Sequence, residues 1–202
     1  MLDFSADADI VAPLLLGRTL SFGSVTIEIT EVEAYLHGTD TAAHSFRGKT
    51  PANAALWGPG GRLYVYISYG IHRCCNLVCG PEGTGQGCLL RSGRVLAGEA
   101  IARSRRGDVS YTRLASGPGN LAKALGVGTE HNHLAVEQVS ARVDSPPPRG
   151  TATMTPQLGI RSQEPEWVAG PRIGISKNVA APLRFWIPND ATVTSPKRPP
   201  KC

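Results

Sequence analysis

The chain has 202 residues, of which 41% are hydrophobic and 18% charged, and its formal net charge is +5 at pH 7. This length and composition predict a single domain over residues 1–202 that can bury a substantial core. Its apolar segments are far shorter than the roughly 20 residues that a bilayer span needs, and no export signal is evident, which argues against a membrane protein.

The cysteines and the arginines narrow the class of protein further. Cys74, Cys75, Cys79, Cys88 and Cys202 are odd in number and mostly crowded together, so we expect reduced thiols rather than a disulfide framework. Arginines dominate the positive excess and gather in the stretch RSGRVLAGEAIARSRRG. This stretch is either a solvated helix face or a phosphate-binding surface, and composition alone favours neither.

The first half of the chain predicts a helix, a strand and a hairpin. A helix is expected over Ile10–Leu16 and a strand over Ser24–Tyr35, followed by a polar loop through Gly60. The sequence RLYVYISYGIHRCCNLVC then contains two β-rich runs broken at Ser68-Tyr69-Gly70, a pattern typical of a hairpin with glycine at its turn. Tyr69 is expected at the tip.

The second half predicts further strands and two helices. Glycines flank a strand in GTGQGCLLRSG, a helix is expected over Leu96–Arg106, and a shorter helix begins at Pro118 and stops at Gly126. PRIGIS and PLRFWI are expected as strands, the region of Pro146–Pro148 as an extended connection, and residues 195–202 as a disordered tail. These elements predict an α+β domain with a curved, largely antiparallel or mixed sheet, flanking helices and a protruding hairpin.

Carboxylates occupy positions of the first long strand where core residues are expected. One face of this strand carries, in order, Val25, Ile27, Ile29, Glu31, Glu33 and Tyr35. An inward carboxylate is unfavourable unless it is paired, hydrogen-bonded or functional. Glu33 is therefore either half of a structural ion pair or a functional acid.

Aromatic residues favour the functional interpretation of Glu33. Four of the five tyrosines fall between positions 35 and 69, and His44 lies among them. Aromatic faces beside an acid and a basic surface indicate a planar group, stacked in a site, that belongs to a polyanion. A nucleobase in a nucleic acid fits this description.

Eight short motifs, in order and sensibly spaced, resemble the alkyladenine (3-methyladenine) DNA glycosylase family that lacks a helix-hairpin-helix. They are EVEAY, AAHS, RLYVYISYG, Asn76, LLR, SGPGNL, PRIG and PLRFW. The resemblance runs from about Leu14 to Ile187. It implies a monofunctional enzyme that flips damaged purines out of duplex DNA and hydrolyses their N-glycosidic bond. The implied lesions are 3-methyladenine, 7-methylguanine and ethenoadenine, with deaminated hypoxanthine as a further candidate.

The resemblance also implies a catalytic centre. Glu33 corresponds to the general base that deprotonates the attacking water, and Arg91 to an arginine that positions this water and the adjacent phosphate. Ile173 corresponds to a residue whose backbone carbonyl also holds the water. The resemblance implies no metal and no organic cofactor, and none of the lysines aligns with the pocket as a Schiff-base step would require.

The remaining implied roles concern the base. Tyr35, His44 and Tyr66 correspond to the walls of the base pocket, where His44 also offers a hydrogen bond to the base edge. Asn76 corresponds to a residue that discriminates against the exocyclic amino group of ordinary guanine. Aromatic walls favour a cationic alkylated base by about 0.5–2 kcal/mol.

Further implied roles concern the DNA duplex. Tyr69 corresponds to a side chain that intercalates through the minor groove into the gap left by the extruded base. Thr50, Arg47 and Ser116 are expected to contact the DNA backbone, although Ser116 is also placed to cap a helix. We expect a monomer that acts on double-stranded DNA in a bacterial cytoplasm, associated with the nucleoid, or in a nucleus if the source is eukaryotic.

Two other classes of function compete with this prediction. A non-catalytic module that binds damaged DNA would keep the groove and the stacking residues but turn nothing over. A zinc-dependent nucleic-acid hydrolase or deaminase would use Cys74, Cys75 and Cys79 with His72. Paired C-x-x-C spacings are lacking, however, and neighbouring residues of a strand point to opposite faces, so we expect no metal site there.

Overall fold

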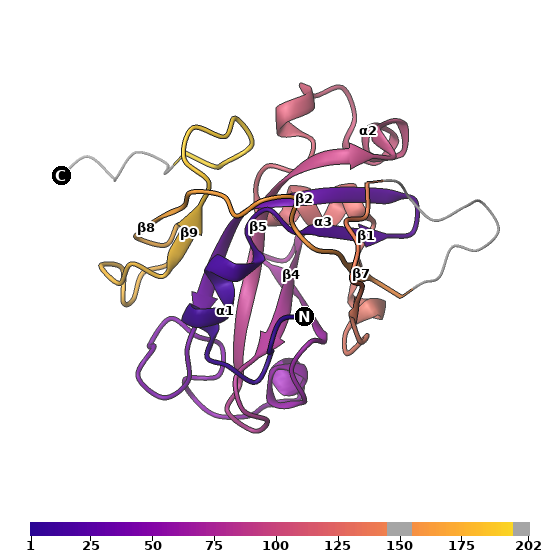
Figure 1. The fold of residues 1–202 in the computed structure, drawn as a ribbon. Coiled ribbons are helices and arrows are strands. Elements are labelled where there is room, and N and C mark those ends of the chain that lie inside the picture. Colours follow the sequence, from indigo (N-terminus) through magenta and orange to yellow (C-terminus); the bar gives the residue numbers. More distant parts are fainter. Residues whose placement is uncertain (145–154, 196–202) are drawn as a thin grey trace.

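A computed structural model describes residues 1–144 and 155–195, shown as a ribbon in Figure 1. The helices are α1 (Ala8–Leu15), α2 (Glu99–Arg106) and α3 (Pro118–Leu125), with the 3-10 helices η1 (Pro51–Trp57), η2 (Tyr111–Arg113) and η3 (Thr129–His131). The strands are β1 (Thr19–Phe22), β2 (Val25–Tyr35), β3 (Leu63–Ser68), β4 (His72–Cys79), β5 (Gln86–Ala97), β6 (Glu137–Gln138), β7 (Gln157–Leu158), β8 (Val168–Gly170) and β9 (Arg184–Trp186). The connection predicted around Pro146–Pro148 and residues 196–202 of the predicted tail lie outside the described residues. No helix within the described ranges is long and apolar enough to cross a membrane.

The strands of the described ranges form one curved sheet (Figure 1). Its order is β3-β4-β5-β2-β1-β7-β6, with β9 also pairing with β2, and β8 with β9. All pairs are antiparallel except β6 with β7, which is parallel. The prediction of an α+β domain with a largely antiparallel, mixed sheet is confirmed.

The central strand β2 is covered on both faces, which places its acids in the interior. Helix α1 packs on β2, and α3 packs against β4 and β5. Within β2 only Glu28 and Tyr35 keep partial exposure. Because Glu31 and Glu33 lie inside the domain, each needs compensating partners if it is to stay ionised.

Strands β3 and β4 form the predicted hairpin. The Ile71 N–H donates to the Ser68 carbonyl at 3.2 Å. Between them, Tyr69 and Gly70 have positive φ values of 49° and 74°. Two successive positive values are typical of a type I′ turn, whose twist matches that of the flanking strands. Tyr69 lies at the tip, as predicted, with 83% of its surface exposed.

The helix predicted over Leu96–Arg106 begins later, at Glu99. Strand β5 continues through Ala97, which pairs with Thr26 of β2, so the first two predicted helical residues belong to the sheet. Gly98 then turns the chain with a φ of 75°, and a Cβ at this position would lie 2.0 Å from the Ser24 carbonyl oxygen. The ladder with β2 and this close approach set the boundary.

The prediction of a strand in PRIGIS is also wrong, because residues 171–176 have no regular secondary structure. The Ile173 N–H donates to the Glu33 side chain and the Arg172 side chain binds Asp40. These residues therefore form hydrogen bonds with side chains rather than with the backbone of a neighbouring strand. The predicted strand in PLRFWI is confirmed as β9. The loop predicted to run through Gly60 contains the 3-10 helix η1, which was not predicted.

Candidate active site

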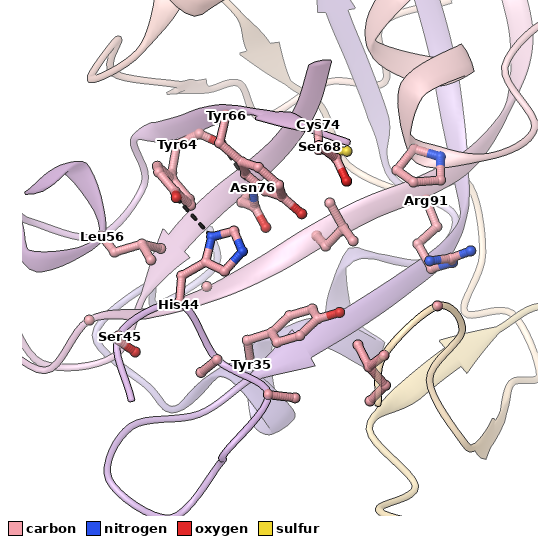
Figure 2. A pocket seen from close by; sticks show the side chains of 18 of the residues that line it. Tyr35, His44, Ser45, Leu56, Tyr64, Tyr66, Ser68, Cys74, Asn76 and Arg91 are labelled. Atoms are coloured by element: carbon pink, nitrogen blue, oxygen red, sulfur yellow. Dashed lines mark hydrogen bonds between the residues drawn. The ribbon is translucent and has the colours of Figure 1, made fainter. Parts of the chain in front are cut away.

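A cavity of about 580 Å³ lies among β2, β3, β4 and β5 (Figure 2). It is lined by every residue that was predicted to contact the base, namely Tyr35, His44, Tyr66 and Asn76, and by Ile173, which was predicted to hold the attacking water. Arg91 and Tyr69 line it as well. The fold thus brings together residues that are up to 138 positions apart in the chain, Tyr35 and Ile173.

One side of the cavity is an aromatic wall formed by His44, Tyr64 and Tyr66. The two tyrosine rings stack with centroids 5.4 Å apart, and the His44 ring meets Tyr66 edge-on at 4.5 Å. His44 Nδ1 lies 2.9 Å from the Tyr64 hydroxyl. Desolvation lowers the pKa of His44 from its ordinary 6.5, so its ring is neutral at neutral pH, and burial raises the pKa of Tyr64 to about 12. The wall therefore presents uncharged aromatic surface.

Asn76 lies next to this wall and is held by the backbone of β3. Its side-chain Nδ2 donates to the Tyr64 carbonyl at 3.0 Å. This bond fixes the orientation of the amide group, which lines the cavity. An amide so fixed is suited to accept or reject a base by hydrogen bonding, which keeps the predicted role of Asn76 open to test.

Tyr35 lies across the cavity from the Tyr64 and Tyr66 rings (Figure 2). Its hydroxyl donates to Glu33 Oε2 at 2.9 Å. Burial and the neighbouring Glu33 carboxylate raise the pKa of Tyr35 well above its ordinary value. The Arg172 guanidinium stands 4.5 Å from the ring centroid and does not line the cavity, so it backs the ring from the protein side.

Glu33 itself has no exposed surface, and it lies directly behind the residues that line the cavity. Its Oε1 accepts the Ile173 N–H at 2.8 Å and faces Arg91 Nη1 at 3.2 Å, while Oε2 accepts the Tyr35 hydroxyl. All three partners are cavity residues. Ile173 thus meets Glu33 through its N–H, whereas the family resemblance implies a role for its carbonyl.

A second buried acid, Glu31, accepts hydrogen bonds from several side chains beside the cavity. It is surrounded by Arg91, Arg184, Ser92 and Thr194, which we call with it the Glu31 cluster. Glu31 Oε1 accepts Arg91 Nε at 3.0 Å and Arg184 Nε at 2.6 Å, and Oε2 accepts the Ser92 hydroxyl at 2.8 Å. Although burial opposes ionisation, Arg91, Thr194 and Arg184 lower the pKa of Glu31 below its ordinary value.

The position of Arg91 depends on a β-bulge in strand β5. In the ladder with β2, Ser92 pairs with Glu31 and Leu90 with Val32, so Arg91 has no partner there. An extra residue of this kind re-aims its side chain. Arg91 can consequently reach both acids, and these acids raise its pKa although burial opposes the charge.

The chain is similar to known proteins over most of its length. A family model described as "Methylpurine-DNA glycosylase (MPG)" matches residues 2–191. The chain belongs to this family. The predicted resemblance is therefore confirmed, and with it the enzyme class of a DNA glycosylase.

Several bacterial proteins named "Putative 3-methyladenine DNA glycosylase" are similar over nearly their whole length. A Corynebacterium glutamicum protein is 57% identical over 99% of this chain and 98% of its own. A Corynebacterium efficiens protein is 53% identical over 99% and 97% of the two chains, and a Cutibacterium acnes protein is 47% identical over 98% and 100%. This glycosylase therefore shares its full domain with them.

Among the residues predicted to contact the DNA duplex, Tyr69 lines the cavity of the glycosylase, whereas Arg47, Thr50 and Ser116 do not. Tyr69 reaches toward the segment that carries Ile173, with its hydroxyl 3.4 Å from the Gly174 carbonyl. Arg47 and Thr50 are exposed in the loop that follows His44. Ser116 is half-buried and forms a bridge with Ser92, and Gly117 occupies the N-cap of α3 that Ser116 was considered for. Their contacts with DNA remain predictions.

The arginine-rich stretch divides between two environments. Arg91 is buried in the Glu31 cluster, and Arg94 pairs with Asp190 at 2.5 Å. Only Arg105 and Arg106 reach a second hollow, of about 640 Å³. This hollow, bordered by hairpin and helix residues, also contains Ile71, His72, Arg73 and Lys123. The basic surface is therefore narrower than the sequence stretch indicates.

The cysteines of the described ranges are free thiols. Cys74, Cys75, Cys79 and Cys88 are all buried without a disulfide. Cys74 lines the cavity, whereas Cys75 on the other face of β4 belongs to the core. Among the residues that the structure describes, no three His, Cys, Asp or Glu side chains are grouped as a metal site would need.

Sequence reasoning missed Glu31, Arg184 and Thr194 as parts of this site. Glu31 shares its face of β2 with Glu33, which was a usable signal, and Arg184 lies within the quoted motif PLRFW. Nothing in the sequence pattern marks Thr194. The Asp40–Arg172 pair, with bonds of 2.6 and 2.7 Å, was missed as well.

Proposed function

We propose that this chain is a monofunctional glycosylase that extrudes damaged purine nucleotides from duplex DNA and hydrolyses their N-glycosidic bond. The observation that carries the proposal is the Glu33 carboxylate, which lies behind an aromatic cavity and is held by three residues that line it. The names of the bacterial relatives support activity on 3-methyladenine. We place this activity in a bacterial cytoplasm, where the nucleoid supplies the substrate. We extend this substrate range to 7-methylguanine, ethenoadenine and hypoxanthine.

The cavity suits a flipped purine in size and in electronic character. Its volume of about 580 Å³ falls within the range of roughly 300–1,000 Å³ that small-molecule sites occupy. Tyr35 on one side and the aromatic wall on the other can sandwich a planar base. A cationic alkylated purine gains about 0.5–2 kcal/mol from such faces, whereas a neutral purine lacks this term. Damaged bases also cost less to extrude from the stack.

Glu33 has the acceptor capacity to act as general base. A carboxylate offers about four lone-pair positions. Ile173, Tyr35 and Arg91 use three of them, which leaves one for a water. Because Glu33 is covered in the free protein, this water requires the contact with Tyr35 to open when DNA binds.

The proposed reaction follows from these positions. Glu33 takes a proton from the water, the water oxygen bonds to the anomeric carbon, and the bond from that carbon to the purine breaks. An alkylated cationic base leaves as a neutral molecule with the bonding electron pair, so it needs no second acid. A neutral lesion such as hypoxanthine must also take up a proton as it leaves, and solvent water supplies this proton. Lys49, Lys123 and Lys177, the lysines of the described ranges, do not line the cavity, which supports hydrolysis rather than a lyase step.

Duplex DNA is the proposed partner of a monomeric protein. Tyr69 on the hairpin tip borders the cavity, so it can occupy the gap in the duplex while the extruded base enters. The hollow lined by Arg73, Arg105, Arg106 and Lys123 offers positive charge to the sugar-phosphate backbone beside the same hairpin. One cavity then serves one lesion.

Single-lesion duplexes test the proposal under single-turnover conditions. The purified protein is incubated with duplexes that contain each of the proposed lesions, and released free base and alkali-labile sites are both measured. We expect base release only at the lesion, with a loss of about 10²–10⁴-fold in Glu33→Gln, as for removal of a general base. Glu82→Gln, in an exposed loop, is the matched control.

Three outcomes would reject the proposal. Tight lesion binding without base release would favour the non-catalytic module. Conversion of the base without cleavage of its bond to the sugar, with stoichiometric zinc in the protein, would favour a zinc deaminase. Full activity in Glu33→Gln would remove Glu33 from the mechanism.

A further inference from the structure

The segment from Asp190 to Thr194 ends against the Glu31 cluster and lies at the edge of what the family match covers. That match stops at residue 191, so Thr194 is beyond it. The Thr194 N–H donates to Glu31 Oε2 at 2.8 Å, and its carbonyl accepts Arg184 Nη2 at 2.5 Å. A residue near the end of the described chain is thus bonded to the support of the candidate active site.

The Thr194 side chain joins the acid and the arginine of this support. Its hydroxyl lies 2.7 and 2.8 Å from the two Glu31 oxygens and 3.3 Å from Arg91 Nη2. A hydroxyl has one proton to donate and lone pairs to accept with. Because Arg91 can only donate and an ionised Glu31 can only accept, the hydroxyl donates to Glu31 and accepts from Arg91.

Thr194 completes the set of partners around the Arg91 guanidinium. Nε binds Glu31 at 3.0 Å, Nη1 faces Glu33 at 3.2 Å, and Nη2 reaches Thr194. Three directions of contact fix the plane of the guanidinium, whereas two would leave Nη2 without an acceptor in a buried site. The position of Nη1 against Glu33 therefore depends on a residue that touches neither the cavity nor Glu33.

Hydrogen bonds and an ion pair hold the segment from Asp190 to Thr194 against the sheet, so Thr194 has a fixed position. Asp190 accepts both the N–H and the hydroxyl of Thr192, at 2.9 and 2.6 Å. The Thr192 hydroxyl lies 2.7 Å from that of Thr30 in β2. Asp190 also pairs with Arg94 of β5. The two central strands of the sheet thereby hold the segment in place.

We propose that Thr194 is a positioning residue that, together with Glu31, orients Arg91 toward Glu33 and so sets the rate of base excision. This inference rests on the proposed function of Glu33 and Arg91. Thr194 contributes to the chemical step and not to the binding of the lesion, because it does not line the cavity. A hydroxyl at this position is required, and its methyl group is not.

The test compares Thr194→Val, Thr194→Ser and the control Ser195→Ala, which alters the exposed neighbour. Single-turnover base release from a 3-methyladenine or ethenoadenine duplex is measured across pH, with the dissociation constant of the duplex and the melting temperature of each variant. We expect Thr194→Val to slow release by roughly tenfold or more, the effect of removing a hydrogen bond from a charged group. The dissociation constant is expected to stay within about twofold, the mark of an interaction used in the chemical step. Thr194→Ser and Ser195→Ala are expected to behave like the wild type.

The possible results separate this inference from the function on which it rests. If the wild type releases no base, the proposed function fails. If the wild type is active and Thr194→Val matches it, the positioning role is refuted. A loss in Thr194→Val that Thr194→Ser does not restore, or that follows the dissociation constant or the melting temperature, would make Thr194 a binding or structural residue and would also overturn the inference.

Discussion

The aromatic wall and the Glu31 cluster serve the same cavity but differ in how their side chains are held. His44, Tyr64 and Tyr66 meet mainly through ring faces and edges, with one side-chain hydrogen bond between His44 and Tyr64. In the Glu31 cluster nearly every polar atom has a charged or hydroxyl partner. The wall is adaptable surface, whereas the cluster is a buried network with one favoured arrangement.

This difference separates the part of the cavity that recognises the base from the part that cleaves the glycosidic bond. Ring contacts tolerate bases of different outline because every base has a π-face. A general base must stand within hydrogen-bonding reach of its water, and a small displacement of it costs rate. The rigid network therefore belongs next to Glu33, and the adaptable surface belongs where substrates vary.

Removing the charge of Glu31 gives the largest expected effect and tests the rigid half of this comparison. Glu31→Gln leaves Arg91 and Arg184 without their shared acid, which lowers the free energy of unfolding by about 3–5 kcal/mol. Chemical denaturation measures this loss. The control Glu99→Gln breaks an exposed pair with Arg103 and should cost less than about 1 kcal/mol. Equal stability of the two variants would show that the cluster is not a structural network.

Replacing one ring of the aromatic wall gives an intermediate effect on selectivity. Tyr66→Leu removes a face that can meet a cationic base, so the preference for 7-methylguanine over neutral hypoxanthine should fall by about 0.5–2 kcal/mol. The ratio of the two single-turnover rates at limiting protein measures this preference. Tyr111→Leu, outside the cavity, is the control. A preference unchanged in Tyr66→Leu would mean that the wall acts by shape and not by charge.

Acid titration of the wall gives the smallest expected effect. Since the pKa of His44 is lowered in the fold, its neutral ring contributes stability that is complete above the ordinary 6.5 and lost as pH falls through the lowered value. Protonation also places positive charge beside a cationic base, weakening lesion binding on the order of 1 kcal/mol. Binding of a 7-methylguanine duplex to the Glu33→Gln variant, measured from pH 8 to about pH 5, follows this titration without turnover. Adding His44→Gln should flatten the curve, and a curve that keeps its slope would assign the titration to another group.

Much of the fold follows from local pattern in the sequence. The hairpin depends on two β-rich runs and a glycine turn, and α3 on Pro118 at its start and Gly126 at its end, and all of these signals act within a few residues. The helix predicted from Leu96 failed at its first residues because pairing with β2, about 70 positions away in the chain, overrode local helical composition.

The part of the candidate site that lies in short motifs could be predicted from the sequence. The part that depends on long-range pairing between side chains could not. Glu33, Tyr35 and the aromatic wall stand in short strings that resemble a known family, and the structure brings them together. The partners of Glu31 come from residues 60 to 163 positions away, and no periodicity relates them to it. Ionic and hydroxyl partners of a buried acid are selected by the folded geometry, so one sequence does not reveal them.

The bulge that frees Arg91 from its ladder also sets how this domain can vary over evolutionary time. A single-residue deletion between Gln86, where β5 begins, and Arg91 would shift the pairing of this part of β5 with β2 by one position and would reverse which way its side chains point. Substitutions along β5 therefore change individual contacts to different extents, whereas an insertion or deletion before Arg91 disrupts the pairing of the whole segment. Homologous enzymes should conserve the number of residues between the strand start and this arginine more strictly than the identity of the residues themselves.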